Sequence, residues 1–160
     1  DECLNFMGSS IACFLAEGLI AMGRTAEAAA TLRSARQANL RGGDAAQLPE
    51  LLRLEALAQV EESASGGQAI RLLRRSCDLA RQQGAMSWLL RSATALARVH
   101  MLQGDLASAQ GLVEPIYGTF TEGFESHDLK AARQLLRELD VEFRATRRSS
   151  RDTGGPSQRR

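Results

Sequence analysis

Aromatic and β-branched residues are scarce in this 160-residue chain, and their scarcity argues against a β-sheet protein. Aromatic residues make up 4% of the sequence, although hydrophobic residues reach 44%. Leu and Ala, which favour helices, supply most of the apolar surface, whereas sheets favour Val, Ile, Thr and aromatic residues. The length suffices for one domain with a buried core. The composition therefore predicts an all-α protein in which Ala at the helix contacts allows close packing.

Long apolar runs and paired cysteines are also missing. The longest apolar stretch, from Ile11 to Met22, is interrupted by Glu17 and Gly18, so no transmembrane helix is expected. The sequence contains no secretory leader pattern. The three cysteines are Cys3, Cys13 and Cys77. Their odd number and the lack of a CxxC spacing predict free thiols in a cytoplasmic protein.

Charge is nearly balanced overall but uneven along the chain. The net charge of +1 is too small to steer the protein toward nucleic acid or a membrane. From Arg144 to Arg160, six Arg stand against one Asp, so this segment carries +5 and the rest of the chain −4. We expect residues 144–160 to form a disordered basic tail, because apolar residues are few there, and residues 1–143 to form the folded domain. The tail lacks aromatic residues for base stacking, so nucleic acid is not an expected partner.

Three segments share one pattern, in which an apolar-periodic helix, a short turn and a second helix follow one another. The predicted helix pairs are residues 11–22 with 26–39, 48–62 with 68–83, and 86–102 with 106–117. Aligning the turns superimposes three small residues that lie 41 and 40 residues apart, Ala28, Ala69 and Ala109. One helical turn later come three large apolar residues, Leu32, Leu73 and Val113. A small residue followed by a large one on the same face predicts repeated helical hairpins.

Turn and cap residues agree with these boundaries. Three glycines, at which the chain leaves a helix, are Gly23, Gly84 and Gly104. Thr25, Asp105 and Ser126 are expected to cap the helices that follow them. Pro115 predicts a kink, or a break and restart, in the helix that contains it. A final helix is expected from Asp128 to about Phe143.

With turn glycine, small residue and large residue in register, the chain resembles the tetratricopeptide repeat family. Its spacing of 40 to 41 residues is longer than the usual repeat of about 34. It is similar to the long repeats in C-terminal regions of bacterial signalling ATPases, adenylate cyclases and maltose-regulator-type transcriptional regulators, and the closing stretch 112–136 carries the most specific resemblance. The resemblance implies an α-solenoid of about three repeats with a C-terminal capping helix. It implies no catalytic residue, because the matching positions are packing positions.

No constellation for catalysis, cofactor binding or metal binding is apparent in the sequence. The glycines form no phosphate-binding loop, and the two histidines, His100 and His127, stand in no metal-ligand spacing. His100 aligns with apolar positions and is expected to be half-buried. Trp88, Phe120 and Phe124 are expected to pack as an end cap of the repeats, with a binding pocket as the alternative. The candidate contacts of a binding groove lie on first helices and are Asn5, Glu17, Arg53, Gln59, Arg91 and Arg98.

These features favour a non-catalytic sensor or protein-interaction domain from a signalling ATPase, cyclase or regulator, with a protein, a peptide or upstream modules as its partner. The alternatives are an enzyme fragment whose repeats contribute to an active site and a generic assembly scaffold. The chain lacks an initiator Met and begins within a helical pattern, so we interpret it as the C-terminal part of a longer array. Residues from Phe6 to Ile20 would then expose apolar surface and cause self-association.

Overall fold

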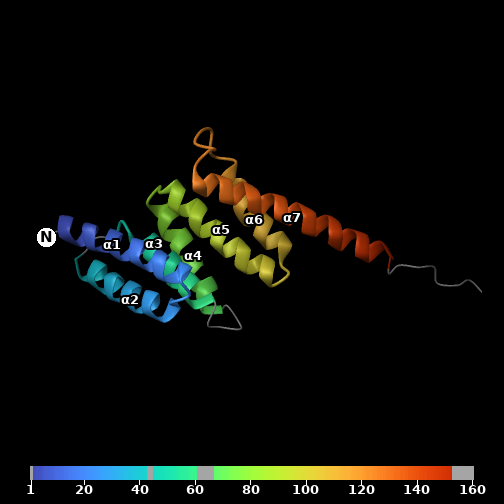
Figure 1. The fold of residues 1–160 in the computed structure, drawn as a ribbon. Coiled ribbons are helices and arrows are strands. Elements are labelled where there is room, and N and C mark those ends of the chain that lie inside the picture. Colours follow the sequence, from blue (N-terminus) through green and yellow to red (C-terminus); the bar gives the residue numbers. More distant parts are fainter. Residues whose placement is uncertain (1, 43–44, 61–66, 153–160) are drawn as a thin grey trace, which may run out of the picture.

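The computed structural model describes the backbone of residues 2–42, 45–60 and 67–152, and the side chains of residues 8–41, 45–59 and 67–147 (Figure 1). Within these residues the chain is all-helical and contains no strand. The helices are α1 (Glu2–Ala21), α2 (Thr25–Gly42), α3 (Leu48–Val60), α4 (Gly67–Gln82), α5 (Met86–Leu102), α6 (Leu106–Tyr117) and α7 (His127–Asp152). The predicted all-α class is therefore confirmed, and the predicted bounds of α5 and α6 agree with the structure.

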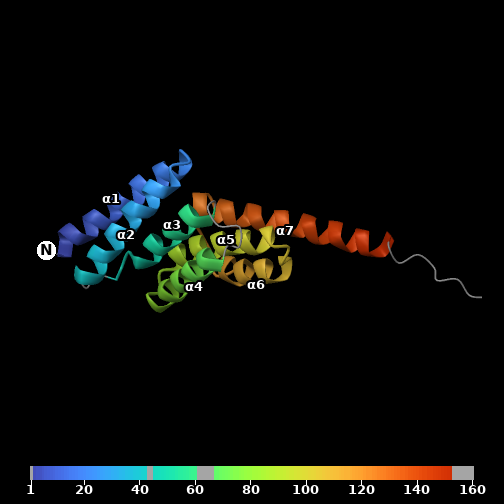
Figure 2. The ribbon, with the colours of Figure 1, turned by 90° about the horizontal axis from the view of Figure 1, so that it is seen from below.

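Consecutive helices pack against one another as pairs, and the pairs follow each other in chain order. The pairs α1–α2, α3–α4 and α5–α6 lie from one end of the molecule toward the other, and α7 covers the last of them (Figures 1 and 2). The first helices of successive pairs also touch, because α1 packs on α3, α3 on α5, and α5 on α7. This arrangement brings side chains from α1, α3, α5 and α7 onto a common surface.

The core is built at the positions that the repeat alignment singles out. Ala28, Ala69 and Ala109 are buried on α2, α4 and α6, as are the large residues one turn later, Leu32, Leu73 and Val113. On the first helices the same offsets of 41 and 40 residues superimpose Leu15, Ala56 and Leu96. These positions are less uniform, because Ala56 and Leu96 are buried whereas Leu15 is exposed. The apolar side chains form three clusters, one between α1, α2 and α3, one between α3, α4 and α5, and one between α4, α5, α6 and α7.

The turns contain the predicted backbone conformations and the predicted caps at Asp105 and Ser126. Gly23, Gly84 and Gly104 have φ values of +74°, +67° and +79°, which L side chains rarely adopt. Asp105 Oδ1 accepts a hydrogen bond from the Ser108 backbone N–H at 3.1 Å, and Ser126 Oγ accepts one from the Leu129 N–H at 3.4 Å. Thr25 is the first residue of α2 rather than the residue before it, and the carbonyl oxygen of Arg24 accepts the Ala28 N–H.

Two expectations differ from the structure. Pro115 lies inside α6 without a break and restart, because it is in the last turn, where only the one hydrogen bond to the Gly111 carbonyl is lost. Helix α7 extends to Asp152, so residues 144–152 are helical rather than disordered. Arg is a good helix former, and neither Gly nor Pro occurs in this stretch, so the low apolar content does not end the helix. The remaining residues of the expected tail, 153–160, lie outside the described part of the chain.

Truncation of a fully buried residue on α4 tests the core. Leu73→Ala should lower the free energy of unfolding by about 2–5 kcal/mol, since it removes buried methyl groups and leaves a cavity. Leu102→Ala is the matched control, because that side chain is 77% exposed, and its effect should stay within about 0.5 kcal/mol. Urea unfolding followed by circular dichroism measures both. Equal effects of the two substitutions would contradict the packing described above.

Candidate binding site

Four of the six predicted groove residues line one cavity of about 230 Å³ on the surface shared by α1, α3, α5 and α7. They are Glu17 from α1, Arg53 from α3, and Arg91 and Arg98 from α5. Gln59 is half-buried on α3 but does not line the cavity. Asn5 belongs to α1, and its side chain lies outside those that the structure describes. Residues distant in the chain are thus brought together here.

Charged side chains in this cavity hold one another in place. Arg53 donates two hydrogen bonds to Glu50, from Nε to Oε2 and from Nη2 to Oε1, both at 2.8 Å. Glu17 Oε1 accepts from Nη2 of Arg53 at 2.9 Å and from Nη2 of Arg91 at 2.8 Å. Arg91 also reaches Glu50 Oε1 at 2.8 Å through Nη1 and Asp128 Oδ1 at 3.4 Å through Nε. One network therefore joins α1, α3, α5 and α7.

Burial makes this network different from surface ion pairs. The side chains of Glu50 and Arg53 are only 6% and 9% exposed. Burial alone would lower the pKa of Arg53, but its hydrogen bonds to Glu50 and the charges of Glu50 and Glu17 outweigh burial and hold the pKa above its usual value. The guanidinium group therefore stays charged and, together with that of Arg91, compensates the buried carboxylate of Glu50. The cavity is therefore lined by positively and negatively charged side chains that are held in place by one another.

The sequence interpretation missed three polar contributors to this site. Glu50 lies one turn before Arg53 on the same helix face, so an i, i+3 pairing could have indicated it. Asp128 lies in the first turn of α7 and reaches Arg91 only through the packing of α7 on α5. Thr94 also lines the cavity. The residue is buried, at 8% exposed, and its Oγ1 has no hydrogen-bond partner. A buried hydroxyl normally finds a partner, so the unpaired Oγ1 of Thr94 is an exception beside the cavity.

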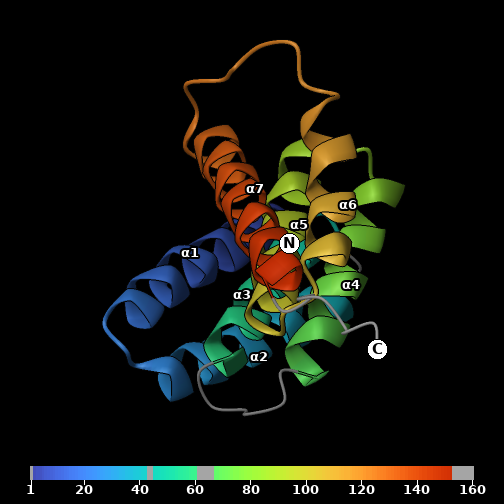
Figure 3. The same cartoon turned by 90° about the vertical axis from the view of Figure 1, so that its right-hand side faces the viewer.

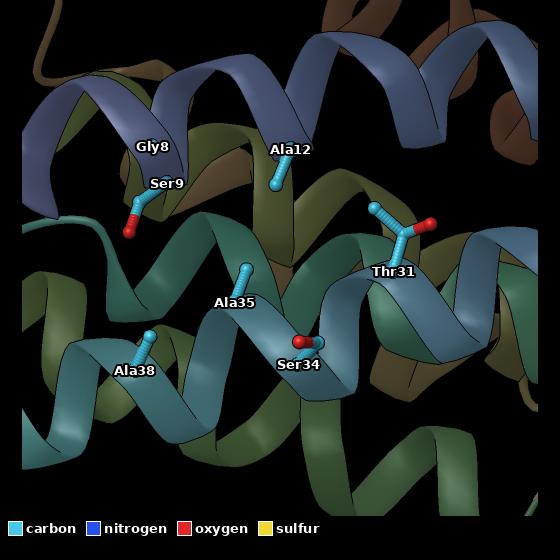
Figure 4. A pocket seen from close by; sticks show the side chains of 7 residues that line it. All are labelled: Gly8, Ser9, Ala12, Thr31, Ser34, Ala35 and Ala38. Carbon is cyan, nitrogen blue, oxygen red and sulfur yellow. The ribbon is translucent and has the colours of Figure 1, made fainter.

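A larger cavity, of about 450 Å³, lies between α1 and α2 and is lined only by small residues. Figure 4 shows Ala12 of α1 and Ala35 of α2 pointing toward one another across it, with Ser9, Thr31 and Ser34 nearby. None of its lining side chains is charged. This cavity reflects the close approach of two helices with short side chains, and it contains no group that would orient a ligand.

The two histidines and the aromatic residues that the sequence singles out lie at different places in the fold. His100 is half-buried, as expected, with Nδ1 3.8 Å from Asp105 Oδ2. His127 is exposed beside Asp128 at the rim of the cavity shared by α1, α3, α5 and α7, which we call the polar cavity. Trp88 and Phe120 pack against the cluster formed by α4, α5, α6 and α7, as expected of an end cap, whereas Phe124 is 36% exposed with its ring centroid 6.0 Å from that of Tyr117. Among the residues that the structure describes, no group of three or more His, Cys, Asp or Glu is placed to hold a metal ion.

Comparisons with known proteins do not identify the chain. No family model matches it, and neither the curated proteins nor the solved structures contain a match. None of the helices in the described part of the chain combines the length and the apolar character needed to cross a bilayer.

Removal of one member of the buried pair tests the energetics of the network. Arg53→Met should destabilise the protein by about 3–5 kcal/mol, because it leaves Glu50 buried without its main counter-charge. The double variant Glu50→Leu with Arg53→Met should be more stable than Arg53→Met alone, since it removes both buried charges. Chemical unfolding measures both variants, and Arg33→Met on the exposed side of α2 is the control. A double variant no more stable than Arg53→Met would contradict this account.

Thiol reactivity tests the burial of two cysteines. Burial raises the pKa of Cys13 to about 12, with a further contribution from the charge of Glu50, and burial raises the pKa of Cys77 to about 11. The thiolate is the reactive form, so both thiols should react slowly with iodoacetamide at neutral pH in the folded protein. A Cys3→Ser variant leaves only these two thiols to be measured by mass spectrometry. Labelling as fast in the native state as in guanidinium chloride would contradict their burial.

Proposed function

We propose that this chain is a non-catalytic protein-interaction domain, an α-solenoid of tetratricopeptide-like hairpins that binds a peptide segment at the polar cavity. The solenoid is supported by the contacts between successive first helices and by the 40- to 41-residue spacing of the buried Ala and Leu positions. Two helices alone bury little apolar surface, so stacking of neighbouring hairpins supplies the core. The first helices then present one continuous surface.

The observation that carries the proposal is the convergence of Glu17, Arg53, Arg91, Arg98 and Asp128 on one cavity from four helices. Its lining also contains three apolar side chains, those of Leu57, Ala95 and Ala131. A peptide offers both hydrogen-bond donors and acceptors along its backbone and apolar side chains between them, and this mixture matches such a lining. Groups already held in place lose little freedom on binding, which favours affinity.

Binding rather than catalysis is the chemistry that this arrangement suits. Arg91 contacts Glu17, Glu50 and Asp128 at once, so these three carboxylates position a guanidinium group. Arg98 is the most available cation, because its side chain is nearly half exposed and its contact with Glu138 Oε2 is 3.6 Å long. We assign Arg98 as the charged group that meets the peptide, and the buried pair as the support beneath the cavity.

The place of the domain in a larger protein is also a proposal. The resemblance of residues 112–136 to the ends of repeat arrays supports a sensor or regulatory domain of a bacterial signalling ATPase, cyclase or transcriptional regulator. Binding of a peptide without ATP hydrolysis or cyclase activity separates this function from an enzyme fragment. A generic assembly scaffold differs in having no linked NTPase or cyclase module.

Selection from a random peptide library displayed on phage tests the binding function. The folded chain should enrich peptides that bind in a fluorescence titration with measurable affinity, and Arg98→Glu should weaken that binding by about tenfold or more, because it reverses a charge at the cavity. Arg33→Glu is the matched control on the exposed side of α2 and should bind as the unchanged chain does. Circular dichroism should show that both variants remain helical.

Two outcomes would overturn the proposal. One is the absence of any enriched peptide after repeated selection with folded protein. The other is equal weakening by the Arg98→Glu and Arg33→Glu substitutions, which would place the peptide elsewhere or reduce the effect to net charge.

A further inference from the structure

Helix α1 exposes an apolar stripe on the side opposite its core face. Ile11, Phe14 and Leu15 are 62%, 75% and 52% exposed, and Met22 continues the stripe toward the end of the helix. Gly8 and Gly18 lie on the same face of the helix, since Gly8 is three residues before Ile11 and Gly18 is seven residues after it. The opposite side of α1, which includes Ala12, Ala16 and Leu19, is buried. No charged residue interrupts the stripe, and contiguous exposed apolar surface of this kind marks an interaction site.

The equivalent stripe on α5 is an interface between helices. The offset of 81 residues that superimposes Ala28 on Ala109 places Ile11, Phe14, Leu15 and Gly18 at the positions of Ser92, Ala95, Leu96 and Val99. All four α5 residues are buried. Ala95, Leu96 and Val99 pack with residues of α3 and α4, and the hydroxyl groups of Ser92 and Ser76 are hydrogen-bonded at 2.7 Å. By register, the exposed face of α1 is therefore the face that receives another helical element.

Helix α1 is also accessible at the outside of the molecule. It forms one edge of the fold when the molecule is viewed along its length (Figure 3), and the pair α1–α2 lies at the end opposite the far end of α7 (Figure 1). The outer face of α7 offers a poor match to the stripe, since its exposed residues include Lys130, Gln134, Arg137 and Asp140. A contact between the α1 end of one molecule and the α7 end of another would take Lys130, Arg137 and Asp140 out of water against a stripe that carries no charge.

The stripe is complementary to itself when two helices run antiparallel. If Phe14 of one helix lies opposite Leu15 of the other, then Ile11 lies opposite Gly18 in both halves of the contact. A large residue thus faces a small one, and Gly18 has open space where a side chain would stand. The same two pairings occur twice, which is the condition for a closed two-fold interface.

We propose that a second copy of this chain covers the exposed face of α1, with the two α1 helices packed antiparallel about a two-fold axis. The dimer buries Ile11, Phe14 and Leu15 of each copy, as the equivalent α5 positions are buried within one chain. The polar cavity lies on a different side of α1, where Glu17 projects, so peptide binding and dimerisation use separate surfaces.

Sedimentation velocity over a wide concentration range tests the dimer with the full chain. The unchanged chain should form a dimer and no larger species. Phe14→Lys and Leu15→Glu should each weaken dimerisation by roughly thirtyfold or more, because each places two charges in the centre of the apolar contact. Both residues are exposed in one molecule, so circular dichroism and thermal unfolding should show that the variants remain folded.

A mixture of the two variants tests the antiparallel geometry. The lysine introduced in one variant would face the glutamate introduced in the other, while the second half of the interface keeps its apolar pair, so mixing Phe14→Lys with Leu15→Glu should restore the dimer. Leu102→Glu, which removes an exposed apolar residue elsewhere, and Arg98→Glu at the cavity should leave the dimer unchanged. A monomeric unchanged chain, an open series of larger species, a dimeric Phe14→Lys variant or a mixture that stays monomeric would each overturn the proposal.

Discussion

Burial of a small and a large residue one turn apart on each second helix is the constraint on which the fold depends. The small residues Ala28, Ala69 and Ala109 let two helix backbones approach, and the large residue that follows each of them fills the space between the pairs. The same pattern of a small and a large buried residue recurs in all three pairs. The first helices are in mutual contact, and the polar cavity forms on the surface that they share with α7.

The buried ion pair beneath the polar cavity fixes the positions of the charged side chains around it, but removing its two charges from water costs free energy. Glu50 and Arg53 are almost completely removed from water, and their desolvation is offset only by close, well-aligned hydrogen bonds. An apolar pair of similar size would suit the core at least as well. The charged pair instead holds Glu17 and Arg91 in fixed positions at the cavity, so its contribution is to the geometry of the surface as much as to the stability of the fold.

Helix α1 has fewer neighbours than α5 within the described part of the chain, since α1 packs on α2 and α3 whereas α5 packs on α3, α4, α6 and α7. Residues equivalent to its exposed stripe are buried on α5 by the preceding pair of helices, whereas Ile11, Phe14 and Leu15 are exposed to solvent. A helix that is apolar on both sides is stable in water only when both sides are covered or the exposed side is small. Helix α1 therefore contributes to both proposed interactions, to dimerisation through its exposed apolar stripe and to peptide binding through Glu17 at the polar cavity.

Much of the fold could be predicted from the sequence, because helices and turns depend on neighbouring residues. The period of Leu and Ala, the turn glycines and the cap residues Asp105 and Ser126 are local features, and they predicted α5 and α6 at their observed bounds. The predicted end of α7 was wrong because low apolar content was taken as disorder, although the backbone hydrogen bonds of a helix need no apolar neighbour. Of the two alternatives predicted at Pro115, the break and restart was wrong, because α6 continues to Tyr117 and only one hydrogen bond is lost in its last turn.

The candidate site was predictable only in part. Periodicity placed Glu17, Arg53, Arg91 and Arg98 on first helices, and these residues do line one cavity. Their partners could not be predicted, since Glu17 and Arg91 lie far apart in the chain and Asp128 enters from α7. The sequence by itself determined which residues share a helix face, because that follows from 3.6 residues per turn. Only the tertiary structure decided which faces meet, which charges are buried and which apolar stripe has no neighbour, because these depend on contacts between helices rather than within them.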